Sequence, residues 1–225
     1  MATGVRPPAG PAEPDRIRPD PQIRNVLLVL ASALIFSALS RWPVRRLGPV
    51  DCDEIVSLDA IRDHWFPMHH TLFLALARLA GTIVRTPYDG FVLLGIIVSA
   101  LALAGVWWWL RAVTRPSVAF AATVALGVGP LFWTYGASAA SYTGIVLVGS
   151  LLLGIAVRAR RSPAPWYPFA AAALLALGTG YREDIGMLWT PVFFAILARY
   201  RYKTAIAAAA LFAMLLALAD HPPLR

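Results

Sequence analysis

The sequence predicts an all-α, polytopic membrane protein with about seven transmembrane helices and two juxtamembrane helices in the first loop outside the membrane. Composition supports this fold class, since 59% of the 225 residues are hydrophobic, 14% are charged and the mean hydropathy is +0.65. Soluble globular domains are about half apolar and about a quarter charged. The apolar residues also form runs long enough to cross a bilayer, which takes about 20 residues.

The formal charge of +8 does not indicate nucleic-acid binding, because the basic residues fall in short clusters between apolar runs. Such clusters are typical of loops that flank membrane spans. Residues 1–24 hold six prolines and four arginines and too little apolar surface to fold, so we expect a disordered cytoplasmic tail. The single cysteine, Cys52, excludes an intramolecular disulfide.

Seven apolar segments are expected to span the membrane, at about 25–41, 90–110, 117–135, 139–157, 165–180, 185–198 and 204–219. The second ends in Trp107-Trp108-Trp109, an aromatic cluster typical of a membrane interface. The fifth and sixth are short and are separated by a polar turn that contains Arg182. Residues 220–225 are expected to form a tail on the outer side.

The apolar segment 71–84 is too short for a further span, because fourteen residues form only about 21 Å of helix. Arg78 lies at its middle, where a charge is costly inside a bilayer. We therefore expect this segment at the membrane interface, which makes 42–89 one large outer loop.

The charges of the remaining loops agree with this choice. With the N-terminus in the cytoplasm, the inner loops contain eight basic residues and no acid: Arg111, Arg115, Arg158, Arg160, Arg161, Arg199, Arg201 and Lys203. All nine acids beyond the tail then lie outside. The positive-inside rule thus supports a multi-pass topology with the N-terminus in the cytoplasm. We expect the protein in the plasma (inner) membrane, with its active face outside.

The outer loop carries a cluster of carboxylates, Asp51, Asp53 and Glu54, at the start of a predicted amphipathic helix. The apolar side of this helix is marked by residues at helical spacing, namely Ile55, Leu58, Ile61 and Trp65. Carboxylates at a helix N-terminus complement the helix dipole. Like charges this close are also typical of catalytic and ion-binding sites. From the cluster alone, capping of the helix and a catalytic or ion-binding role are equally well supported.

Other polar residues fall on the same predicted face, including His69, His70, Tyr142 and the turn with Arg182. Imidazole and carboxylate suit several divalent metals. Adjacent residues on a helix, however, diverge by about 100°, so contact with lipid headgroups is the simpler interpretation of the histidines, and no metal or other cofactor is predicted. Arg182 is either neutralised by its acidic neighbours or binds a phosphate, because its planar guanidinium group can donate two parallel hydrogen bonds to phosphate oxygens.

In their order along residues 25–219, these features resemble the GT-C superfamily of polytopic glycosyltransferases. The nearest likeness is to the protein O-mannosyltransferase and aminoarabinose transferase group (glycosyltransferase family 39-like). Asp53-Glu54 opens the first outer loop, and Pro67–Phe73 lies where the family often has a His-Pro-Pro-Leu-Tyr-like entry to a second juxtamembrane helix. The other two features are Trp107–Arg115, before a span ending in Phe132–Tyr135, and the Gly-rich stretch Gly178–Asp184, before a helix ending in Trp189-Thr190-Pro191.

The resemblance implies transfer of a sugar from a polyprenyl-phosphate donor to an acceptor at the outer membrane face. It implies Asp53, with Glu54 beside it, as the catalytic pair, Asp53 being the general base. Arg182 would neutralise the departing lipid phosphate. The other expected substrate-binding residues are Asp51, His69, His70, Tyr142 and Asp184.

Two departures from the family pattern keep other functions open. Members often carry an acid at the start of span 4, but residues 139–143 contain none, which leaves Glu183 or Asp184 to supply it. The chain also ends after about seven spans, as expected for an N-terminal module, a truncated reading frame or one half of an enzyme completed by a partner chain. The alternatives are a non-catalytic transporter or lipid-binding protein and an inactive module that acts as a partner subunit.

Overall fold

The computed structural model describes residues 21–47, 52–62, 71–137 and 141–220, and every regular element in these ranges is a helix. The all-α prediction is therefore confirmed. In chain order the elements are α1 (Pro21–Arg41), the 3-10 helix η1 (Trp42–Leu47), α2 (Cys52–Arg62), α3 (Thr71–Gly81), α4 (Pro87–Val113), α5 (Pro116–Val128), α6 (Pro130–Ala137), α7 (Thr143–Arg161), α8 (Tyr167–Tyr181), α9 (Glu183–Leu197) and α10 (Tyr202–Asp220).

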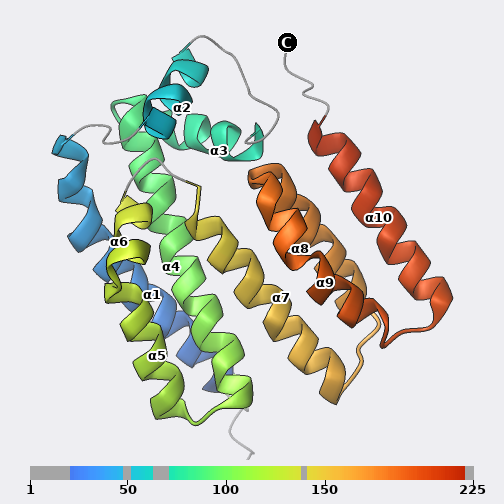
Figure 1. Cartoon of the computed structure of the whole chain (residues 1–225). Helices are drawn as coiled ribbons and strands as arrows, with labels where there is room; N and C mark the ends of the chain where they lie inside the picture. Colours follow the sequence, from blue (N-terminus) through green and yellow to red (C-terminus); the bar gives the residue numbers. More distant parts are fainter. Residues whose placement is uncertain (1–20, 48–51, 63–70, 138–140, 221–225) are drawn as a thin grey trace, which may run out of the picture.

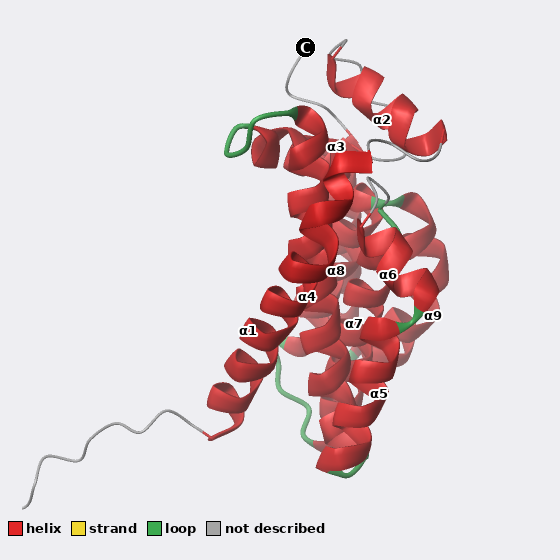
Figure 2. Cartoon of the chain, turned by 90° about the vertical axis from the view of Figure 1, so that its left-hand side faces the viewer, coloured by secondary structure: helices red, strands yellow, loops and turns green. Residues whose placement is uncertain are grey.

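Most of these helices stand side by side, and the two short helices α2 and α3 lie at one end of the bundle (Figures 1 and 2). We call this the α2–α3 end. From α1 onward the helices run alternately toward and away from it, with the pair α5–α6 continuing in one direction (Figure 1). The turn between α8 and α9 lies at the same end, where α3 packs against α8.

Three described helices are long and apolar enough to cross a membrane, namely Arg24–Arg41 within α1, α4 and α7. The bent pair α5–α6 makes a fourth if it is counted as one span. The remaining predicted spans are shorter, because α8 and α9 have 15 residues each and the apolar part of α10 covers Tyr202–Leu218. These features indicate a membrane protein, and the count of seven spans stays a prediction.

The segment predicted as a single span over 117–135 is divided at Gly129-Pro130, where α5 and α6 meet at an angle of 61°. Proline lacks the N–H group that would continue the helix, and it favours an extended conformation at the residue before it. Gly129 adopts such a conformation, with φ −59° and ψ 130°. The break turns α6 so that it packs against α1, η1 and α4.

The segment 71–84, predicted to lie at the interface, forms the 11-residue helix α3 across the end of the bundle. On the side of α3 that faces the bundle, its residues Phe73, Leu74 and Ala77 are buried. Gly90 at the start of α4 allows its close approach, because a Cβ atom there would lie 2.6 Å from the backbone N of Gly81. This contact fixes α3 against the top of α4.

The predicted apolar side of the first loop helix is confirmed where the structure describes it. In α2, Ile61 is buried and Leu58 packs against the core, while Asp59 is exposed. Trp65 lies outside the described residues.

The acidic residues and the basic residues of the predicted inner loops lie at opposite ends of the bundle, while Arg41, Arg46, Arg78, Arg85 and Arg182 lie at the α2–α3 end with the acids. The eight basic residues assigned to inner loops all lie in or beside the turns α4–α5, α7–α8 and α9–α10, at the end opposite α2 and α3. Every acidic residue in the described ranges lies toward the α2–α3 end: Asp53, Glu54, Asp59, Asp89, Glu183, Asp184 and Asp220. The acids and the inner-loop bases thus lie at the two ends of the bundle, and their orientation in the membrane stays a prediction.

Candidate functional site

Arg182 lies between two helices at the α2–α3 end. Its backbone N–H donates to the carbonyl of Gly178 at 2.8 Å, which closes α8, and the next residue begins α9. The backbone of Arg182 is extended, with φ −159° and ψ 123°, so the chain reverses sharply there. Glu183 and Asp184 then fall in the first turn of α9, where acidic side chains complement the positive end of the helix dipole.

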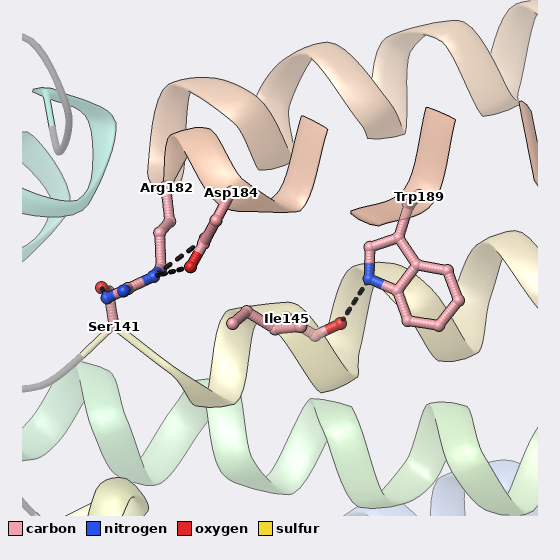
Figure 3. Close-up of polar contacts among 5 residues, drawn as sticks. All are labelled: Ser141, Ile145, Arg182, Asp184 and Trp189. Atoms are coloured by element: carbon pink, nitrogen blue, oxygen red, sulfur yellow. Dashed lines mark hydrogen bonds and ion pairs between the residues drawn. The ribbon is translucent and has the colours of Figure 1, made fainter. Parts of the chain in front are cut away.

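The guanidinium group of Arg182 has three partners, of which Figure 3 shows Asp184 and Ser141. Its Nε–H is shared between the two carboxylate oxygens of Asp184, at 2.9 and 2.8 Å, and Nη1 donates to Oγ of Ser141 at 3.0 Å. Its Cζ atom lies 3.9 Å from the centroid of the Tyr142 ring, a cation–π distance. The Tyr142 ring in turn packs on Tyr135, with 4.5 Å between their centroids.

These contacts set the charge state of the cluster. Burial by itself lowers the pKa of Arg182, but the hydrogen bond and negative charge of Asp184, aided by Tyr142, more than offset it and raise the pKa above its ordinary value. Arg182 therefore stays a cation at every physiological pH. Its side chain is 17% exposed and that of Asp184 is 32% exposed, so the pair faces solvent or ligand on one side.

Two aromatic side chains fix the helices that carry the cluster. Tyr181 is buried, and Gly144 of α7 makes room for it, because a Cβ atom at 144 would lie 2.5 Å from Cε1 of the ring. The same ring meets Phe73 of α3 edge-on, with 5.2 Å between centroids. Further along α9, Nε1–H of Trp189 donates to the carbonyl of Ile145 at 3.2 Å (Figure 3).

The structure thus brings together three of the expected site residues, Tyr142, Arg182 and Asp184, and adds Ser141 to them. Ser141 is buried and precedes Tyr142 in the stretch 139–143, from which only Tyr142 was expected at the site. Its hydroxyl joins residues 41 positions apart, and no local pattern indicates such a contact.

The structure does not describe the side chains of the remaining expected site residues. Asp53 and Glu54 lie in the first turn of α2, where the structure describes only the backbone. Asp51, His69 and His70 lie outside the described residues. In the part of the chain that the structure describes, no three His, Cys, Asp or Glu side chains gather into a group that could hold a metal ion.

Arg182 and Asp184 offer a cation and an anion on one partly open surface, beside a serine hydroxyl and a tyrosine ring. Such a cluster suits recognition of a polar or anionic group through charge-assisted hydrogen bonds. Comparison of the chain with models of protein families, with curated proteins and with solved structures finds no match.

Proposed function

We propose that this chain is a membrane glycosyltransferase, or the N-terminal module of one, that uses a polyprenyl-phosphate sugar donor at the α2–α3 end. The observation that carries the proposal is the position of α3. This short helix contacts α2, which bears Asp53 and Glu54 in its first turn, and it also contacts α8, which ends at the Arg182 cluster. A carboxylate pair and a fixed arginine are thereby connected to one small helix, although 129 positions separate Asp53 from Arg182 in the sequence.

The proposed reaction needs a base on one side of the sugar and a cation on the other. The acceptor oxygen attacks the anomeric carbon, and Asp53 takes the proton of the acceptor hydroxyl. The bond between the anomeric carbon and the phosphate oxygen breaks, and the lipid phosphate leaves with the electron pair. Arg182 stabilises that charge, so the leaving group needs no proton.

The contacts of Arg182 support its part in this scheme. Asp184 and Ser141 hold the guanidinium in one orientation before any ligand binds, and preorganised charge is what stabilises a developing anion most effectively. Partial exposure leaves one side of the group open to a ligand.

One observation favours a second candidate function, a lipid-binding protein without catalysis. Asp184 already neutralises Arg182, and residues 139–143 supply no further acid. In this case the Arg182 cluster would bind a lipid phosphate without promoting its departure.

Transfer of radiolabelled sugar from a polyprenyl-phosphate donor, measured in membranes that contain the full chain, tests the proposal. Wild type should transfer sugar, while Asp53→Asn and Arg182→Gln should each lose at least about 100-fold, as expected for a base and for one electrostatic contact to the transition state. Asp59→Asn on the exposed side of α2 and Arg78→Gln on α3 serve as matched controls and should keep wild-type transfer. Retention of the donor without sugar transfer would establish the lipid-binding function. The absence of both donor retention and sugar transfer would refute both functions.

A further inference from the structure

Arg41, the last residue of α1, is fully buried, yet most of its guanidinium group is unpaired. Its side chain is 0% exposed. Nη1 donates to Oγ of Ser37 at 3.0 Å, but Nε and Nη2 have no hydrogen-bond partner among the residues that the structure describes. A buried, uncompensated cation is strongly unfavourable, and an ionisable group within a membrane segment is most often functional.

The unpaired atoms form a recognisable binding edge. Nε–H and one N–H of Nη2 lie side by side on the guanidinium, and this edge matches two oxygens of a phosphate or carboxylate. A third donor lies close to it, because Oγ of Ser99 is also buried without a hydrogen-bond partner among the described residues. A Cβ atom at Gly136 would lie 2.6 Å from Nε, 3.1 Å from Nη2 and 2.4 Å from Oγ of Ser99, so the three groups lie close together against Gly136 of α6, and a headgroup can enter only if α6 moves.

An apolar groove of about 310 Å³ runs between α1, α4 and α5, on the side of Phe36 away from Arg41 and Ser99, neither of which lines it. Phe36 joins the two features, since its ring lines the groove and its centroid lies 5.9 Å from Cζ of Arg41. The lining is almost wholly apolar, and several of its side chains are exposed: Leu28, Phe36, Phe120, Val124 and Val128.

The depth of Arg41 fits a lipid headgroup. The apolar segment Arg24–Arg41 has 18 residues, or about 27 Å of helix, which is close to the hydrocarbon thickness of a bilayer. Arg41 therefore stands at the level of the phosphates when the segment crosses the membrane, and the groove extends from it toward the hydrocarbon.

We propose that Arg41 and Ser99 bind the phosphate of an anionic membrane lipid whose hydrocarbon chain lies in the groove between α1, α4 and α5. The chemistry of the site identifies the ligand. The unpaired donors require an anionic group, and the apolar groove requires a hydrocarbon chain. This site is separate from the Arg182 cluster, and it does not depend on whether the chain transfers a sugar.

The headgroup reaches Arg41 by a small movement of α6. Phe132, whose ring centroid lies 5.7 Å from Cζ of Arg41, and Gly136 both belong to this helix. Because α6 has eight residues and follows the 61° break at Gly129-Pro130, this movement would pivot at the break and would change the contacts of α6 with α1, η1 and α4.

Photolabelling of the full chain in dodecyl maltoside micelles tests this site, because that detergent has no phosphate. The probe is phosphatidic acid with a diazirine in its acyl chain, and the matched probe is the diacylglycerol with the same diazirine. Wild type should be labelled by phosphatidic acid on α1 and α5. Arg41→Gln should lower this labelling by about tenfold, as expected for the loss of a bidentate charged contact, without changing labelling by diacylglycerol. Arg46→Gln, an exposed arginine in η1, should match wild type.

Two further variants cover a failure of Arg41→Gln to fold. Ser99→Ala removes one donor and should lower phosphatidic-acid labelling several-fold, and Gly127→Leu fills the groove beside Leu103 and should lower labelling by both probes. Labelling that is the same in wild type, Arg41→Gln and Ser99→Ala would overturn the proposal. Protection by millimolar inorganic phosphate would also overturn it, because the site would then take free phosphate.

Discussion

Replacing Gly149 by alanine should force α7 and α9 apart. A Cβ atom at this position would lie 1.9 Å from Cζ2 and 2.3 Å from Cε2 of Trp189. Carbon atoms in favourable contact are about 3.5–4.0 Å apart, so relief requires a movement of about 1.5–2 Å. The indole cannot simply rotate away, because its Nε1–H is bonded to the carbonyl of Ile145.

The magnitude follows from two opposing effects. Overpacking of this severity costs about 3 kcal/mol, and alanine regains about 1 kcal/mol over glycine in a helix. The net loss of about 2 kcal/mol lowers the unfolding midpoint by about 4–8 °C in a chain of this size. The midpoint is measured in detergent micelles by tryptophan fluorescence at a fixed scan rate, because thermal unfolding of membrane proteins is commonly irreversible.

Two companion variants make the test specific to this contact. Gly81→Ala is the matched control, since the nearest atom to its new methyl group would be Cα of Pro87 at 3.7 Å, and its midpoint should not fall. Adding Trp189→Phe to Gly149→Ala supplies a smaller ring and should recover part of the loss. A wild-type midpoint for Gly149→Ala would refute the close approach of the two helices.

Two other predictions concern polar contacts outside the spans. Arg182→Gln and Asp184→Asn, measured singly and together, should show a coupling free energy of unfolding of about 1–2 kcal/mol, and additive effects would mean that the pair in Figure 3 does not form in solution. The hydroxyl of Tyr200 donates to the carbonyl of Ala164 at 2.9 Å, and burial, together with Tyr167, raises the pKa of Tyr200. Since the folded state then holds the proton more tightly, its stabilisation is complete below about pH 10 and is lost as pH rises further. The stability difference between wild type and Tyr200→Phe should therefore be about 0.5–1.5 kcal/mol at pH 8 and shrink above pH 10, and a constant difference would contradict the assignment.

The sequence was sufficient for features that depend on local pattern. Helical periodicity predicted the apolar side of α2 that buries Ile61, and the short length of 71–84 excluded it as a span, in agreement with the 11-residue helix α3. The dipeptide Gly129-Pro130 carried the signal for the break between α5 and α6, but a continuous apolar run obscured it. Hydropathy measures only the transfer of residues to lipid, so a bent apolar segment and a straight one look the same on this scale.

Contacts between distant residues could not be predicted, because they depend on how helices pack. Nothing near Ser141 indicates that its hydroxyl meets Arg182, and Gly149 is unremarkable until Trp189 is seen against it. No sequence pattern singles out Arg41, and its burial between the Phe36 and Phe132 rings appears only once α6 is in place. Positions of this kind need either an alignment of related sequences or a structure.

The shortness of α8 and α9 has a consequence for the membrane itself. Each has 15 residues, which make only about 22 Å of helix, whereas α4 has 27 residues and about 40 Å. If α8 and α9 cross the bilayer, as the sequence predicts, the lipid beside this hairpin would have to thin by several ångströms to match it, since deforming the lipid is one way to relieve hydrophobic mismatch. The headgroups, and the water among them, would then dip toward the turn that carries Arg182, and a lipid phosphate would meet that arginine in a depression of the membrane surface.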